Sequence, residues 1–301
     1  MTLAPRASIV IPAYHSHTTL RQCLEALRAQ TFRDFEILLV NSSNEPETAR
    51  VVQDFPEVRF TQSPVRLLPH AARNVAVQQA RGDFLIFTDP DCRARPDWLE
   101  RLISSHNAGH SVVGGAMELS NGTALERAIH LSKFFWLLPG VTAGRCPVIC
   151  TANASYDRAA WNAAGPFDDE LFTGDALLAM RAATRGHAPW FEPAAIVEHS
   201  HEGTARLYVR QFFRRGQEFA AARAVQEAWS GWRIAAHVVT GLFVPLLILA
   251  RTASCAARSG WISAFITSFF YQLVFRLAWS VGEMAAQVDL LTSRGISAHR
   301  K

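Results

Sequence analysis

The chain is predicted to be an α/β protein with a mainly parallel sheet covered by helices, followed by a short apolar helical region. Two observations predict this fold. In the N-terminal part, short apolar runs alternate with stretches of helical periodicity, which is typical of successive βαβ units. From residue 231 to residue 286 the composition shifts toward Phe, Leu, Ile, Val and Trp. We therefore expect one α/β domain over residues 1–228 and a pair of apolar helices within 229–301.

The predicted elements follow from hydrophobic spacing. In the first helix, Leu20, Leu24 and Leu27 lie on one face, and Thr18 or Thr19 can cap its start. A later helix begins at Pro69, a residue suited to the first turn. Strands are expected at Ser8–Pro12, Phe35–Val40, Val58–Thr61, 84–89 and Ser111–Gly115, and helices at Thr18–Gln30, Glu45–Asp54, Pro69–Gln79 and from Pro96 onward.

Composition limits the possible partners. With 301 residues, 49% of them hydrophobic, the chain can bury a sizeable core. The net charge of +4 suits phosphate ligands or anionic lipid headgroups. This excess of positive charge is too small to predict nucleic-acid binding, and the basic residues do not match a known nucleic-acid-binding motif.

The cysteines and the N-terminus bear on the compartment. None of the five cysteines has the paired spacing of a zinc site, so we expect free thiols in a reducing compartment. The first residues lack a charged start followed by an apolar stretch, so no secretory signal is predicted. The α/β domain is therefore expected to stay in the cytoplasm.

Two carboxylates follow the predicted strand at 84–89. Asp89 and Asp91 would stand at the carboxyl end of the sheet, where open α/β sheets bind their ligands. Two such carboxylates can hold a hard divalent cation that bridges a diphosphate. A solvated turn is the alternative. Asp175 on a helix and His199 after an apolar run favour the site.

A series of short sequence words runs through the N-terminal part. They are Val10-Ile-Pro-Ala-Tyr14, Leu24-x-x-Leu27-x-x-Gln30-Thr31, 35–40, Ala72-Arg73-Asn74, Gly82-Asp83, Phe87-x-Asp89-x-Asp91, Pro96-x-Trp98-Leu99, Thr151-Ala-Asn153, Gly165-x-Phe167-Asp168 and Gly174-Asp175-x-x-Leu178-x-x-Arg181. Each word alone is weak. Together and in this order they resemble family 2 glycosyltransferases, which have the nucleotide-sugar-binding, Rossmann-like GT-A fold.

The resemblance implies a metal site that serves a nucleotide-sugar donor. It makes Asp91 a ligand of Mn²⁺ or Mg²⁺, places Asp89 near the ribose and the metal, and lets His199 complete the site. Such a cation stabilises the charge that grows on the leaving diphosphate. An ordinary strand-end histidine is the alternative reading of His199, and His201 is a weaker candidate.

The resemblance also implies an inverting transfer with Asp175 as the catalytic base. The base would take the proton of the acceptor hydroxyl as that oxygen attacks the sugar. An acid in the first turn of a helix is also a routine partner of the helix dipole. The family usually has Glu before this Asp, whereas here Gly174 precedes it. This departure leaves the base in place but puts the glutamate's contribution to acceptor binding in doubt.

Nucleotide recognition departs from the family pattern as well. Asn41 stands where the family usually has an acidic residue that accepts a hydrogen bond from the base. Its amide oxygen can still accept, although without charge assistance. The other residues that the resemblance places at the nucleotide sugar are Pro12, Tyr14, Arg73, Asn74, Asp89, Asn153 and Arg214.

The segment 206–216 resembles the Q-x-x-R-W element of membrane polysaccharide synthases. Gln211 and Arg214 match it, and Arg215 replaces the tryptophan, which argues against a processive polymerase. Arg214 could reach a diphosphate, because the guanidinium fork suits phosphate. A basic amphipathic helix on a lipid surface, with Phe212 and Phe213 in the lipid, is the favoured alternative.

Two apolar stretches follow, Ile234–Ala250 and Trp261–Ala286. The first is short for a span, and a spanning hairpin would leave Arg251 and Arg258 in the outer loop, against the positive-inside rule. In-plane or re-entrant helices satisfy these charges better. A soluble helical hairpin used for dimerisation is the third possibility.

Two functions are therefore weighed. The first is a membrane-associated glycosyltransferase, its catalytic domain cytoplasmic, acting on a lipid-linked or saccharide acceptor near the membrane. The second is a catalytically silent nucleotide-sugar-binding or scaffold subunit, which only Asn41 and Gly174 favour. The intact set Asp89, Asp91, Asp175 and His199 favours the enzyme.

Overall fold

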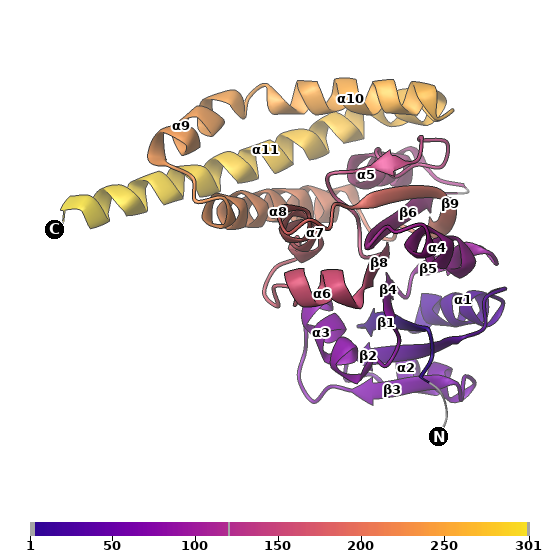
Figure 1. Ribbon diagram of the computed structural model, residues 1–301. Coiled ribbons are helices and arrows are strands. Elements are labelled where there is room, and N and C mark those ends of the chain that lie inside the picture. The colour runs from indigo at the N-terminus through magenta and orange to yellow at the C-terminus, as the bar shows by residue number, and fades with distance from the viewer. Residues whose placement is uncertain (1–3, 120, 300–301) are drawn as a thin grey trace. The chain divides into compact units, whose positions relative to one another are not determined.

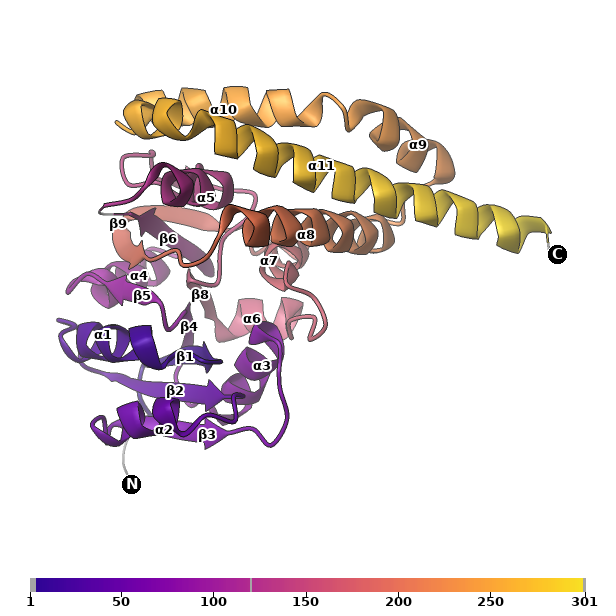
Figure 2. The same ribbon diagram turned by 180° about the vertical axis from the view of Figure 1, so that it is seen from behind.

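The computed structural model describes residues 4–119 and 121–299 of the chain. The chain forms two compact units, one made of Met1–Ser120 and Leu137–Ser200 and the other of Asn121–Trp136 and His201–Lys301. The first unit contains the sheet, and the second is helical (Figures 1 and 2). The boundary predicted near residue 228 marks a change in composition, and it stays a prediction.

The first unit is built on a nine-stranded sheet within the described residues, which confirms the α/β fold class. The strand order is β3-β2-β1-β4-β8-β6-β9-β5, with β7 paired to β9. β1 to β4 are parallel as predicted, but β8 runs antiparallel to both β4 and β6, so the sheet as a whole is mixed. The strands are β1 Ala7–Ala13, β2 Phe35–Asn41, β3 Val58–Gln62, β4 Phe84–Thr88, β5 Cys92–Ala94, β6 Val112–Glu118, β7 Gly144–Arg145, β8 Asn153–Asp157 and β9 Trp190–His199.

Helices flank this sheet and bury their apolar faces. In the first helix, Leu20, Leu24 and Leu27 are buried, as their spacing predicts. The helix predicted at Pro69–Gln79 has these same bounds, with proline in its first turn. The helices of this unit are α1 His17–Arg28, α2 Pro46–Gln53, α3 Pro69–Gln79, α4 Trp98–Asn107, α6 Arg158–Ala164 and α7 Gly174–Thr184.

The parallel strands bring polar residues to one edge of the sheet. Ala13 at the end of β1 lies opposite Asn41 at the end of β2. The neighbouring strand β4 is fully buried at Leu85, Ile86 and Phe87 and then runs into the first of the two carboxylates. Carboxyl ends of parallel strands meet at the same edge, where open α/β sheets bind their ligands.

A buried amide bridges an irregularity between β6 and β9. The register of this parallel pair shifts between Gly115 and Ala116. The Nδ2 atom of Asn153 donates to the carbonyl oxygens of Ala116 and Ala195, both at 2.9 Å, and its Oδ1 accepts from Trp98 Nε1 at 2.8 Å. A Cβ on Gly115 would come within 2.2 Å of the Ala195 oxygen. Only glycine leaves room for this bridge.

The second unit is a set of packed helices. Gly216 of α8 and Gly282 of α11 allow close packing, since a Cβ on either would come within 2.2 Å of a carbonyl oxygen of the facing helix. α8 and α11 lie side by side in both views (Figures 1 and 2). The helices are α5 Ala124–Phe134, α8 Ala205–Gln226, α9 Gly231–Thr240, α10 Val244–Arg258 and α11 Ile262–His299.

The apolar C-terminal stretches form α9, α10 and α11. Within the described residues, one helical stretch, Ile262–Thr292, is long and apolar enough to cross a membrane by length and composition. The pair α9 and α10 passes the same test only when taken together, and it is bent by 65° at the break. The predicted pair of apolar helices is therefore one long helix and one bent pair.

We expect Asn153→Ala to lower the free energy of unfolding by roughly 2–4 kcal/mol, because two carbonyls and an indole N–H would stay buried without partners. Urea unfolding followed by circular dichroism measures this. Asn162→Ala is the matched control, since Asn162 is exposed on α6. Equal losses for the two variants would contradict the bridging role.

Candidate active site

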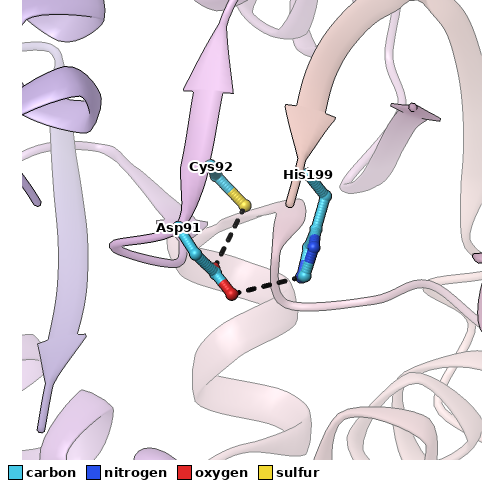
Figure 3. A group of neighbouring side chains, drawn as sticks. All are labelled: Asp91, Cys92 and His199. Atoms are coloured by element: carbon cyan, nitrogen blue, oxygen red, sulfur yellow. Dashed lines mark hydrogen bonds and ion pairs between the residues drawn. The ribbon is translucent and has the colours of Figure 1, made fainter. Parts of the chain in front are cut away.

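Asp91 and His199 come together where β5 pairs with β9. Asp91 lies in the turn before β5, and His199 is the last residue of β9. His199 Nε2 lies 3.7 Å from Asp91 Oδ2, and the side chains are 8% and 38% exposed. The Ser200 N–H also donates to the Asp91 carbonyl oxygen. An imidazole nitrogen thus faces a carboxylate that solvent can still reach (Figure 3).

Asp89 has a different partner. The guanidinium of Arg73, buried on α3, forms an ion pair with the Asp89 carboxylate. Arg73 Nη1 is in turn 3.2 Å from the Nδ1 atom of His70, one turn earlier on the same helix. The charge of Asp89 is therefore compensated within the protein, unlike that of Asp91, whose neighbour is a histidine.

Cys92 is the third side chain of the Asp91–His199 cluster (Figure 3). Its sulfur lies 3.9 Å from Asp91 Oδ1, and the residue is buried. Burial, followed by the charges of Asp91 and Asp89, raises the pKa of the Cys92 thiol well above its ordinary value. A thiol next to the two carboxylates was not among the predicted site residues.

Asp175 lies in the first turn of α7, and its Oδ1 accepts a hydrogen bond from the Ala176 N–H at 2.8 Å. The Cys150 thiol is affected both by Asp175 and by Asp89, the carboxylate that follows β4. Burial raises the pKa of that thiol, and the charges of Asp175 and Asp89 raise it further. The charges of Asp175 and Asp89 therefore both act on the same thiol, that of Cys150.

The His70 ring occupies the space that a side chain at position 174, just before Asp175, would need. A Cβ on Gly174 would come within 2.8 Å of His70 Cδ2. The ring is buried and stacks on Phe167 at a centroid distance of 4.7 Å. The space that a side chain at position 174 would need is therefore filled by an imidazole that also contacts Arg73.

The amides of three predicted nucleotide-binding residues are engaged within the protein. Asn41 Nδ2 donates to Gln62 Oε1 and its Oδ1 accepts from Ser43 Oγ, both at 2.9 Å. Asn74 exchanges hydrogen bonds with the backbone of Phe167, and Asn153 bridges β6 and β9 as described above. Their roles at the nucleotide stay predictions.

The remaining predicted residues lie on different elements. Pro12 is buried near the end of β1, and Tyr14 after it is exposed beneath the Arg66 guanidinium, 4.7 Å from the ring centroid. Arg214 lies on α8 in the second unit, where its Nε donates to Glu218 Oε1 at 2.8 Å. The predicted phosphate contact of Arg214 is not tested by this pairing.

The chain belongs to glycosyl transferase family 2, whose family model matches residues 8–163. Membership makes the protein a glycosyltransferase, as the sequence words predicted, and supports glycosyl transfer from a nucleotide sugar as its reaction class. Glycosyltransferase AglE of Haloferax volcanii is 27% identical over 219 residues, which are 69% of this chain and 71% of that protein. A similar Campylobacter jejuni protein, GalNAc(5)-diNAcBac-PP-undecaprenol beta-1,3-glucosyltransferase, is 25% identical over 44% of this chain and 42% of its own.

The fold has solved counterparts. Mannosyltransferase PcManGT of Pyrobaculum calidifontis, solved with GDP-Man and Mn²⁺, aligns with a TM-score of 0.63 at 16% identity and covers 94% of this chain and 88% of its own. At this identity the likeness shows the GT-A fold alone. The predicted fold class is confirmed by it.

Two residues near the site escaped the sequence interpretation. Cys92 directly follows the second carboxylate, so a thiol one residue after a D-x-D word was a visible signal. His70 lies within the Pro69 helix, four residues before Asn74, and nothing in its spacing relates it to Gly174. The contact between positions 70 and 174 is purely tertiary.

We expect Gly174→Ala to destabilise the protein by about 1–3 kcal/mol, because the new methyl group must displace the His70 ring. The matched control is Gly231→Ala, also at the first residue of a helix but with open space around its Cβ position. Adding His70→Ala to Gly174→Ala should relieve part of the crowding. Additive losses in a double-mutant cycle measured by urea unfolding would contradict this contact.

Proposed function

We propose that the protein is an inverting, metal-dependent glycosyltransferase that acts on an acceptor at a membrane surface. The observation that carries the proposal is the approach of His199 to Asp91 beside the Arg73–Asp89 ion pair. Asp89 and Asp91 follow the end of β4, and His199 is the last residue of β9. The family model, which matches residues 8–163, includes the two carboxylates and Arg73.

The donor set at Asp91 fits a divalent cation. A carboxylate oxygen and an imidazole nitrogen 3.7 Å apart, with the carboxylate partly open to solvent, suit Mn²⁺ or Mg²⁺ with several positions left for other ligands. When bound, the cation supplies positive charge to a diphosphate leaving group. We infer that Asp89, held by Arg73, faces the ribose side of the donor, and the ion pair that fixes its carboxylate supports this. The Mn²⁺ bound by PcManGT together with GDP-Man supports this assignment.

Asp175 is proposed as the general base. Its carboxylate lies in the first turn of α7, where Oδ1 accepts from the Ala176 N–H, and we infer that this carboxylate takes the proton of an acceptor hydroxyl. Attack from this side, opposite the departing diphosphate, inverts the anomeric centre. Gly174 before it leaves this base in place, and the space that a side chain at position 174 would need is filled by His70.

We expect Asp175→Asn to retain donor binding while transfer falls by roughly 10²–10⁴-fold, because an amide cannot accept the acceptor's proton. Asp91→Asn should instead weaken Mn²⁺-dependent donor binding by about 10–100-fold. Calorimetry of the donor and a transfer assay separate the two effects.

The control for this pair is Asp54→Asn, an exposed carboxylate that pairs with Arg21. It should leave both readouts unchanged. Loss of donor binding in Asp175→Asn would make Asp175 a binding residue, and normal Mn²⁺-dependent binding in Asp91→Asn would remove Asp91 from the metal site.

The helical unit is proposed to bind the membrane and so to restrict the enzyme to membrane-bound acceptors. Its long helix presents an apolar stripe to solvent: Ile262, Ile266, Phe269, Phe270, Leu277 and Val281 are exposed at helical spacing. The α9–α10 region adds Trp232, Leu242, Phe243 and Leu246. An undecaprenol-linked compound in the name of the Campylobacter relative supports a lipid-linked acceptor.

The packing of α8 favours helices that lie in the membrane plane. Arg206, Arg210 and Arg214 are exposed at a spacing of four, which places three guanidinium groups along one face of α8. α8 also packs against α11 around Gly216 and Gly282, and both Gly282 and the Trp279 that faces Gly216 lie within the apolar stretch 261–286. A spanning α11 would carry these arginines into hydrocarbon, whereas an in-plane α11 leaves them at the headgroups.

We expect Phe270→Ser to lower flotation of the full-length protein with vesicles, by roughly tenfold in partition coefficient, because a large apolar side chain leaves the lipid. The matched control is Val225→Ser on α8: Phe270 and Val225 are both 70% exposed. Equal effects of the two substitutions would contradict an apolar face on α11.

Topology is tested on vesicles formed before the protein is added. A cysteine at Ser259, between α10 and α11, in a Cys255→Ala background should react with a membrane-impermeant maleimide from outside. Protection of that cysteine until the vesicles are lysed would mean that the helices span. A full-length protein that never floats would overturn the membrane association itself.

A further inference from the structure

Cys92 and His199 face each other across the β5–β9 pair. They are opposite residues in this antiparallel ladder, and opposite residues project from the same face of a sheet. Asp91, just before Cys92, turns its carboxylate toward both (Figure 3). The oxygen, sulfur and nitrogen atoms all lie within 4.8 Å of one another. Three chemically different metal ligands therefore gather around one point.

The spacing of these atoms is close to that of a tetrahedral zinc site. Zinc bonds of about 2.0–2.3 Å place neighbouring ligand atoms roughly 3.3–3.6 Å apart. The nitrogen of His199 is 3.7 Å from Asp91 Oδ2, and the sulfur of Cys92 is 3.9 Å from Asp91 Oδ1. The two distances run to different oxygens of Asp91, whose carboxylate is the most exposed of the three groups, and all the ligand atoms lie within 4.8 Å of one another.

We propose that Cys92 is a third protein ligand for soft divalent ions, and that Zn²⁺ or Cd²⁺ held by Asp91, Cys92 and His199 is an inhibited form of the enzyme. The inference rests on the metal site of the proposed function. As the sulfur–metal bond forms, the S–H bond breaks and its proton passes to solvent. No oxidant or reductant is needed.

The ligand count explains why such a form is inhibited. Tetrahedral zinc with three protein ligands has one open position, whereas a diphosphate that chelates through two oxygens needs two. Mg²⁺ and Mn²⁺ prefer oxygen ligands and six-coordinate geometry, so they leave the thiol aside and keep positions for the donor. Zinc also binds such mixed sites more tightly than manganese does. Trace zinc therefore competes with the productive ion.

Cobalt substitution tests the ligand directly on the full-length protein. After removal of metal by a chelator, Co²⁺ is added and the absorption spectrum is recorded. We expect visible bands of bound Co²⁺ and a near-ultraviolet thiolate-to-cobalt charge-transfer band. Cys92→Ser should lose the charge-transfer band and keep visible bands of bound Co²⁺. Cys92→Ala, with the same expectation, serves where the serine variant does not fold.

The matched control is Cys23→Ser. Cys23 is also buried, and its sulfur contacts the Asp89 carbonyl oxygen at 3.5 Å, but it lies outside the cluster. Its variant should keep the charge-transfer band. Bound Co²⁺ without that band in the wild type, or a band that survives loss of Cys92, overturns this inference and leaves the proposed function standing. Absence of any Co²⁺ binding counts against the metal site of the proposed function as well.

Inhibition gives the second readout. Zn²⁺ should suppress Mn²⁺-supported donor turnover, and Cys92→Ser should raise the inhibitory zinc concentration by at least about tenfold, each variant normalised to its own Mn²⁺ activity. Cys23→Ser should show the wild-type zinc sensitivity. Equal zinc sensitivity of the wild type and Cys92→Ser would overturn the inhibitory role.

Discussion

The geometry of the site depends on one buried amide. Asn153 spans the register shift between β6 and β9, where Gly115 lies opposite Glu192 and Ala116 lies opposite Ile196. Two carbonyls at such a shift would otherwise be buried without donors, which is costly. Because the shift is stabilised, the last residues of β9 regain regular pairing and His199 arrives opposite Cys92. A different register would turn the imidazole to the other face of the sheet.

The same constraint shows how far the sequence could predict this protein. The parallel strands β1 to β4 and the Pro69 helix follow from local hydrophobic spacing, and the family words led from there to the fold class. The bulge could not be predicted, because it depends on an amide brought from another strand. β5 is only three residues long, and β8 contains Asn153 and Ser155, whose burial comes from tertiary hydrogen bonds and not from apolar character.

The two departures from the family pattern, Gly174 and Asn41, both have tertiary partners close to the site. Gly174 suggested a lost acceptor contact and gave the silent-subunit alternative some weight. In the folded chain this glycine makes room for His70, which contacts the arginine that holds Asp89. The space beside Gly174 is thus filled by a residue that contacts the arginine of the site. Asn41 is similar: its amide orders Ser43 and Gln62 at the end of β2, so the polar strand end is retained without the charge.

The two carboxylates of the D-x-D word have different electrostatic environments, because Asp89 pairs with Arg73 and Asp91 faces His199. The charge of Asp89 is compensated by a buried guanidinium, which holds this carboxylate as a fixed hydrogen-bond acceptor. Asp91 has no arginine partner among the described residues and faces His199 and a thiol instead. Under the proposed function, His199 would bind the cation through a lone pair of its imidazole, and the cation would balance the negative charge of Asp91. A divalent ion bound there would keep positive charge to share with a diphosphate, because only one carboxylate opposes it. Two carboxylates on the ion would cancel its charge and weaken its pull on the leaving group. Under the proposed function, the Arg73–Asp89 ion pair would therefore preserve the electrophilic strength of a cation bound at Asp91.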